Sequence, residues 1–179
     1  PLDFFFFFFY CKEPKELVKL SNRMRELLYK YGYTDTLSHL NEWNYVKGWT
    51  GLFKYSIKQI ISLKGSSFIL SCISEAQHAP VDMLMYYDTR PSAFNGVFDF
   101  YTFEKLKGYF PLYWYGMFYD CVKEIPCDTK LDDIYTLCGV KEDGKILATV
   151  THYTDKDFDS EVADKTVTLD FGRSGNFEV

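Results

Sequence analysis

The hydrophobic positions of the first 45 residues follow two different patterns. Residues 2–10 are almost continuously apolar and include six consecutive phenylalanines, a run typical of a parallel-sheet strand buried on both faces. Residues 14–31 instead place Leu, Met or Tyr at steps of three and four, and Gly32 follows, as at the end of an amphipathic helix. A short strand over 40–45 completes a β-α-β unit. The pattern predicts parallel strands and a right-handed crossover.

The same order of elements continues along the chain. A helix is predicted from Phe53, restarting or kinking at Gly65 and ending before Pro80. A strand over 81–87 ends in Tyr86-Tyr87-Asp88 and leads into a long loop over 89–102. Loops of this length are usually functional. An aromatic-rich helix is predicted over 106–122.

Beyond Pro126 the pattern changes to that of antiparallel strands. Segments 134–140 and 146–153 flank the hairpin turn 142–145, and residues 166–171 alternate in the same way. Charged residues over 155–161 predict an exposed, mobile linker.

These elements predict an α/β protein. Residues 1–125 supply three β-α units, the C-terminal portion of a (β/α)8 barrel, and residues 126–179 form part of a small antiparallel β-sandwich. The chain starts inside a strand and without Met, so we expect a piece of a longer protein. An open partial barrel has unpaired edge strands, which predicts pairing with another chain or self-association.

Composition narrows the class of partner. The 179 residues are 47% apolar and 25% charged, which is ordinary for a globular protein, but 20% are aromatic. A large aromatic core explains the aromatic excess best, and a cleft lined for the flat faces of sugar rings is the alternative.

The net charge is -5 without a basic patch, so no nucleic acid is expected. The apolar run at 4–9 is too short to cross a bilayer and lacks the flanks of a signal peptide. No membrane partner is expected, and the compartment stays open.

Cysteine and histidine positions predict no metal site and no cofactor. The five cysteines form no C-x-x-C pair, and their odd number predicts free, mostly buried thiols. The three histidines have no metal-binding spacing; His39 and His78 are expected to be structural.

Two carboxylates fall at the ends of predicted parallel strands. Glu42 closes the strand that begins near Leu40, although Glu is a poor strand former, and Asp88 closes the next strand. In (β/α)8 barrels catalytic residues lie at this end of the strands. The alternatives are a structural carboxylate for Glu42 and a loop anchor or helix cap for Asp88.

Four segments together resemble the glycoside hydrolases of family 39, the β-xylosidase and α-L-iduronidase family. They are Asn41-Glu42-Trp43-Asn44-Tyr45, the strand from Val81 to Asp88, Phe94-Asn95-Gly96-Val97-Phe98-Asp99, and Lys107-Gly108-Tyr109. The resemblance covers about residues 2–125, and the later module is similar to the sandwich packed against those barrels. It implies a retaining hydrolase that cleaves O-glycosidic bonds of β-xyloside-like carbohydrates.

The resemblance also implies roles for single residues. The seventh strand of these enzymes ends in the nucleophile, which corresponds to Glu42, and hydrogen bonds from Asn41, Asn44, Tyr45 or Tyr86 would keep it ionised. Their acid/base lies in an Asn-Glu pair on the fourth strand, which this chain does not contain, so little or no hydrolysis is expected from it alone. Relatives carry polar groups near the end of the sixth strand, where this chain has the phenylalanine run, so a polar contribution from that strand is expected to be missing.

Six residues are predicted to contact substrate. Trp49 is the strongest, because its loop directly follows the nucleophile strand; core packing is the alternative for each aromatic residue. A non-catalytic carbohydrate-binding or assembly module is the alternative function. The predicted substrate contacts are Trp43, Asn44, Trp49, Tyr86, Asp88 and Asn95.

Overall fold

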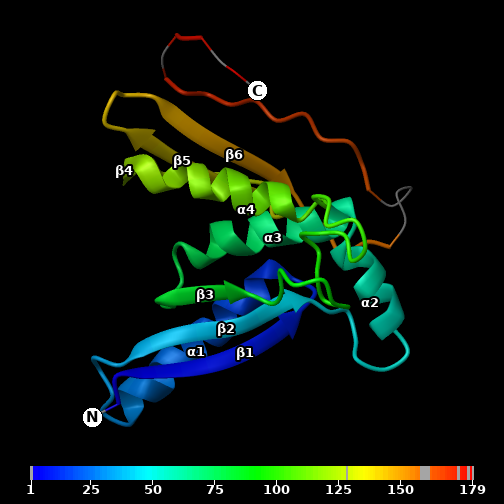
Figure 1. Ribbon diagram of the computed structural model, residues 1–179. Coiled ribbons are helices and arrows are strands. Elements are labelled where there is room, and N and C mark those ends of the chain that lie inside the picture. The colour runs from blue at the N-terminus through cyan, green and yellow to red at the C-terminus, as the bar shows by residue number, and fades with distance from the viewer. Residues whose placement is uncertain (1, 128, 158–161, 173, 177, 179) are drawn as a thin grey trace.

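The computed structural model describes residues 2–127, 129–157, 162–172, 174–176 and 178, and shows two three-stranded sheets with helices around and between them (Figure 1). The elements in chain order are β1 (Phe4–Cys11), α1 (Pro14–Lys30), β2 (Leu37–Tyr45), α2 (Phe53–Ile60), α3 (Leu63–Ala76), β3 (Met83–Tyr86), α4 (Tyr109–Gly116), a 3-10 helix (Met117–Asp120), β4 (Cys121–Glu124), β5 (Ile134–Lys141) and β6 (Ile146–His152).

The first sheet has the order β1-β2-β3, and both strand pairs are parallel. The predicted β-α-β organisation is therefore confirmed, and the chain is a mixed α/β protein. Both pairs show a register shift next to Leu40, so β2 carries one more residue there than its neighbours. Such a bulge turns the following side chains to the other face of the sheet.

Helix boundaries follow from local chemistry. Pro14 opens α1, where its missing N–H costs nothing, and Gly32 follows the helix with a φ of 81°. The break between α2 and α3 falls at Ile61-Ser62, ahead of the predicted Gly65, because the Ser62 hydroxyl accepts a hydrogen bond from the Lys64 N–H and caps α3. Gly65 lies where a Cβ would collide with the Gln59 and Ile60 carbonyls.

The phenylalanine run has two different faces. Phe7 is buried in the core with Phe5 and Phe9 packed at its border. Phe4, Phe6 and Phe8 point the other way and are 50%, 59% and 67% exposed. The prediction that this strand is buried on both faces is wrong, because in the described residues the helices cover one face of the sheet and leave the other open (Figure 1).

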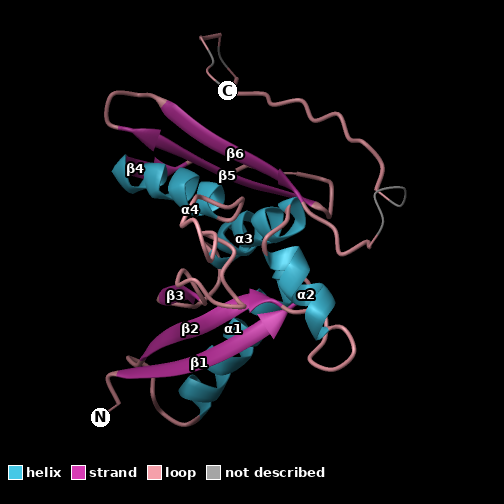
Figure 2. Ribbon diagram, turned by 45° about the vertical axis from the view of Figure 1, so that its right-hand side comes forward, coloured by secondary structure: helices cyan, strands magenta, loops and turns pink. Residues whose placement is uncertain are grey.

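A single core connects both sheets through α3. Figure 2 shows α3 and α4 between the sheets. Phe68 of α3 contacts the rings of Trp43, Tyr45 and Tyr153. Tyr153 follows β6, and Tyr135 of β5 belongs to the same buried cluster, so the second sheet takes part in the core of the first.

The second sheet has the antiparallel order β4-β5-β6. The predicted hairpin is confirmed, with Gly144 at a φ of 80° in its turn. The helix predicted over 106–122 is wrong in its extent, because α4 ends at Gly116 and β4 begins at Cys121. Residues 166–171 form no strand, so that prediction is also wrong.

In the charged segment after β6, Lys156 and Asp157 are exposed as the sequence predicts, but Asp155 is anchored to the first sheet. The Asp155 side chain is 8% exposed and pairs with Lys64 at 2.8 Å and Lys47 at 3.3 Å. Tyr45 at the end of β2 donates its hydroxyl to the same carboxylate at 2.6 Å. Residues 158–161 of the predicted linker lie outside the described residues. Among the residues described, no helix is long and apolar enough to span a bilayer.

Candidate functional site

The candidate site lies where β1 and β2 end and the loop after β3 begins. Phe8 of β1 is the register partner of Glu42 in β2. Leu40, two residues earlier, is buried with the core, and strict alternation would place Glu42 beside it. The bulge at Asn41 instead turns Glu42 to the open face, next to Phe8 and Tyr10.

Tyr10 holds the Glu42 carboxylate. Its hydroxyl donates a hydrogen bond to Glu42 Oε2 at 3.0 Å. Burial, this hydrogen bond and the Glu42 charge raise the pKa of Tyr10 far above that of a free phenol. The phenol therefore stays protonated and can donate at any physiological pH.

This arrangement corrects two expectations. Of the four donors predicted for Glu42, Asn44 and Tyr45 bind other groups, and the buried Tyr86 hydroxyl has no hydrogen-bond partner in the described part of the chain. Tyr10, which sequence reasoning missed, donates to the carboxylate. The polar group expected to be missing from the first strand is present, one residue beyond the phenylalanine run. The signal in the sequence was the change from Phe to Tyr at the strand end.

Aromatic rings surround the Tyr10–Glu42 pair. The Tyr10 ring meets Trp49 edge-on at 5.1 Å and contacts Phe94 at 5.4 Å and Tyr87 at 6.5 Å. The Trp49 indole is stacked on Phe53 at 5.8 Å and remains 57% exposed. Trp49 therefore presents an exposed aromatic surface beside Tyr10, the residue that binds the Glu42 carboxylate.

Two of the predicted substrate contacts, Asn44 and Asn95, hold loops together. The buried Asn44 amide donates to the Tyr87 carbonyl at 2.6 Å and the Phe94 carbonyl at 2.9 Å, which closes the loop after β3 over the end of β2. Asn95 is also buried and accepts hydrogen bonds from the N–H groups of Val97 and Phe98. These contacts give both amides structural partners.

Asp88 is a buried loop anchor. Its carboxylate accepts hydrogen bonds from Arg90 Nη2 at 3.0 Å and Ser92 Oγ at 2.9 Å. Arg90 also lies over the Tyr87 ring at 5.8 Å, so the pair fixes the direction of the loop. Both Asp88 oxygens therefore have partners within the loop.

Trp43 and Tyr86 are not brought to Glu42. Trp43 follows Glu42 and so points to the opposite face, where it is buried against Phe68 of α3 and meets Tyr86 edge-on at 5.3 Å. Their positions match the core-packing alternative for these aromatics.

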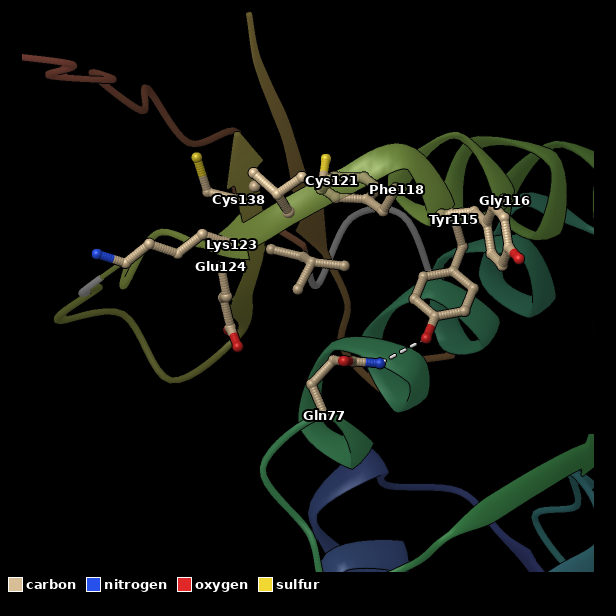
Figure 3. Close-up of a pocket in the computed structure, with 12 residues that line it drawn as sticks. Gln77, Tyr115, Gly116, Phe118, Cys121, Lys123, Glu124 and Cys138 are labelled. Carbon is tan, nitrogen blue, oxygen red and sulfur yellow. Dashed lines mark hydrogen bonds between the residues drawn. The ribbon is translucent and has the colours of Figure 1, made fainter. Parts of the chain in front are cut away.

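A pocket of about 360 Å³ lies elsewhere, between α4, the 3-10 helix and the β4–β5 pair (Figure 3). Tyr115 accepts a hydrogen bond from Gln77 at its border, at 2.6 Å. Cys121 and Cys138 line it. Burial and the neighbouring thiols raise the pKa of Cys138 to about 12, which keeps it a neutral thiol. All five cysteines are free thiols. Across the described residues, no three His, Cys, Asp or Glu side chains are grouped to hold a metal ion.

Comparison with solved structures identifies a similar fold. A glucosidase from Croceicoccus marinus superposes on 86% of this chain with a TM-score of 0.69 and 20% sequence identity. The matched region is 33% of the glucosidase chain, so this chain spans about a third of that enzyme's length. No protein-family model matches the sequence. No curated protein matches it either. The chain thus shares its fold with part of a glycosidase.

Proposed function

We propose that this chain carries the nucleophile of a retaining glycoside hydrolase, and that Glu42 is that nucleophile. The observation that carries the proposal is the position of Glu42: a bulge turns it to the open face at the C-terminal end of a parallel strand, where Tyr10 binds it. The fold shared with part of a glucosidase supports the same assignment.

The role proposed for Glu42 is one half of the reaction. Retaining hydrolysis begins when a carboxylate attacks the anomeric carbon while a second carboxyl group, about 5–5.5 Å away, protonates the leaving oxygen. Glu42 is half-buried and has one oxygen held by Tyr10, so its second oxygen can face the sugar. Asp88 accepts hydrogen bonds from Arg90 and Ser92, and we do not propose it as the acid.

We further propose, from the family resemblance, that this chain supplies the nucleophile without an acid/base of its own. Without a proton donor, substrates with poor leaving groups are expected to stay intact. A leaving group that departs without protonation removes this requirement, so the first chemical step can be tested separately from turnover. The substrate class that we propose is β-xyloside-like, with Trp49 as a stacking surface for the sugar.

The test uses 2,4-dinitrophenyl 2-deoxy-2-fluoro-β-xyloside, whose leaving group needs no acid and whose fluorine slows release of the glycosyl group. Intact mass spectrometry is expected to show one added glycosyl group, which peptide mapping places on Glu42. The matched β-glucoside distinguishes the sugar. The Glu42→Gln variant is expected to remain unlabelled, and Glu26→Gln, a change of an exposed glutamate on α1, to label normally.

The proposal fails if no adduct forms, or if the adduct forms equally in Glu42→Gln. The expectation that this chain alone hydrolyses little or no substrate is wrong if the chain turns over an unactivated aryl β-xyloside and loses this activity in Glu42→Gln.

A carbohydrate-binding module without catalysis is the second candidate. The exposed indole of Trp49, backed by Phe53, favours it, because an aromatic surface binds a sugar without any carboxylate. Xylose-dependent stabilisation that survives Glu42→Ala and disappears in Trp49→Ala, together with no covalent adduct, would select this function.

A further inference from the structure

Three cysteines gather along the pairing of β4 with β5. Cys121 begins β4 and Cys138 belongs to β5, and both line the pocket in Figure 3. Cys127 follows β4, and the pairing continues past the strand end to reach it: the Ile125 N–H donates to the Cys138 carbonyl at 2.9 Å, and the Thr136 hydroxyl donates to the Cys127 carbonyl at 3.3 Å. These two hydrogen bonds place Cys127 beside the part of β5 that carries Cys138.

The thiols of Cys127 and Cys138 are direct neighbours. Burial, and then the Cys127 thiol through its charge and a hydrogen bond between the two side chains, raise the pKa of Cys138 to about 12. A disulfide requires this kind of approach, because its two Cβ atoms lie about 3.5–4.5 Å apart. Cys127 lies beyond the end of β4, so strand pairing constrains its backbone less than that of Cys138. Cys121 packs over Gly139 instead, where a Cβ would come within 2.9 Å of the Cys121 sulfur.

The cysteines differ in their access to solvent. All five lie in the described part of the chain, and Cys127 alone is exposed. Cys11 and Cys72 are buried in the core, where burial raises the pKa of Cys11 to about 12 and that of Cys72 well above the value of a free thiol. The thiolate is the form that attacks other sulfur atoms. A reagent in solution therefore reaches Cys127, and not the neutral thiols of the core.

We infer that Cys127 and Cys138 form a thiol–disulfide exchange site whose substrate is a low-molecular-weight disulfide such as oxidised glutathione. The Cys127 thiolate attacks one sulfur of oxidised glutathione, forms a mixed disulfide and releases one glutathione thiolate. Cys138 then loses its proton and attacks the Cys127 sulfur, which releases the second glutathione thiolate. Two cysteine thiols are thus oxidised to one disulfide, oxidised glutathione is reduced to two thiols, and the two cysteine protons pass to them.

Burial sets the order of the two steps. Cys138 is 4% exposed, so a glutathione molecule does not reach its sulfur directly, and the Cys127 sulfur is the neighbour that it can attack. The mixed disulfide on Cys127 therefore precedes the internal bond. Neither step uses Glu42, so this inference holds or fails independently of the proposed glycosidase chemistry.

The test follows the intact mass of the folded chain during incubation with excess oxidised glutathione, in samples quenched with acid. The final product is expected to be lighter than the reduced chain by two hydrogen atoms. Peptide mapping without reduction is expected to join Cys127 to Cys138, and dithiothreitol to restore both thiols. In urea at about 8 M the preference for this pair is expected to disappear, because the fold no longer holds the two thiols together.

Three variants separate the roles of the cysteines. Cys138→Ala is expected to stop at one glutathione bound to Cys127. Cys127→Ser, a change at an exposed position, is expected to form no internal bond and to react with glutathione at least tenfold more slowly. Cys121→Ser is the matched control, because Cys121 lies on the neighbouring strand, and it is expected to give the same disulfide at an unchanged rate. Circular dichroism checks that each variant keeps its fold.

Four results would overturn the inference. They are a wild-type chain that stays reduced, a mixed disulfide that never closes, an internal bond that includes Cys121, and a Cys127–Cys138 bond that forms equally well in the unfolded chain.

Discussion

The Asp155 carboxylate joins the segment after β6 to the first sheet, and its removal has a calculable cost. In Asp155→Ala, the Tyr45 hydroxyl loses its acceptor, and Lys47 and Lys64 lose a buried partner. Removing one partner of a buried ion pair costs about 3–5 kcal/mol. Both lysines also contact Asp157, so they keep some compensation. We therefore expect the free energy of unfolding to fall by about 3 kcal/mol, the lower end of that range.

Urea unfolding measures this change. With a slope of about 2 kcal/mol per molar urea, the midpoint is expected to shift down by roughly 1.5 M. Asp132→Ala is the matched control, because its side chain pairs with Lys15 at 3.3 Å but is fully exposed. Exposed pairs contribute little, so this variant is expected to change stability by less than about 0.5 kcal/mol. If the two variants lose equal stability, Asp155 is not the buried anchor that its contacts indicate.

The stability that the Asp155 carboxylate contributes also depends on pH, and the direction of this dependence follows from its pKa. Burial raises the pKa of Asp155, but hydrogen bonds from Lys64 and Tyr45 outweigh it, and the net pKa lies below the ordinary value. The contribution is therefore complete above the unfolded-state pKa of about 3.9, and is lost as the pH falls through the lower folded-state pKa. The stability difference between wild type and Asp155→Ala is expected to be constant from pH 7 to about 5 and to shrink in acid. A difference that grows in acid would contradict this reasoning.

Two further predictions concern the Glu42 site and the α2–α3 junction. Tyr10→Phe removes the hydroxyl that binds Glu42 but keeps the ring. A hydrogen bond to a charged group contributes about 1.5–3 kcal/mol, so labelling by the fluoroxyloside is expected to slow at least tenfold. An unchanged rate would show that Tyr10 does not position the carboxylate. Gly65→Ala adds a Cβ that collides with the Gln59 and Ile60 carbonyls, and is expected to lower the free energy of unfolding by roughly 1–3 kcal/mol. Gly116→Ala has open space around the new Cβ and is expected to be neutral or stabilising in the same urea experiment; equal losses would refute the steric explanation.

Local patterns in the sequence predict the elements well and their surroundings less well. The three- and four-residue steps of α1 and the turn between β5 and β6 depend on neighbouring residues, and both elements form where the pattern places them. The alternation at 166–171 is equally clear, yet no strand forms there, because a strand also needs a partner. The phenylalanine run forms a strand, but a continuous apolar sequence does not show that the helices leave one face of its sheet uncovered.

The sequence pattern did not predict which partners the polar side chains bind. A run of aspartates and lysines is usually a solvated surface, and nothing near Asp155 in the sequence indicates that it binds Tyr45, 110 residues earlier. The family resemblance implied substrate contacts for Asp88 and Asn95, with a loop anchor or helix cap as the alternative for Asp88. The structure shows their polar atoms bonded to neighbours within four residues, as is common for Asp and Asn in loops.

The position of Glu42 shows most clearly what sequence alone does not decide. Leu40, Glu42 and Asn44 are every second residue of one strand, and strict alternation of side chains would place the Glu42 carboxylate in the core beside Leu40. One extra residue at Asn41 changes the face of everything after it: Trp43 joins Leu40 in the core, while Glu42 turns to Tyr10. A bulge costs a strand part of its hydrogen-bonded ladder, and bulges are common beside active sites because they re-aim a side chain. The same irregularity appears against both β1 and β3, so β2 itself carries it. A specific feature of the backbone thus turns the half-buried Glu42 out of the core and toward Tyr10, and this is the strongest physical reason to test it as a reacting group.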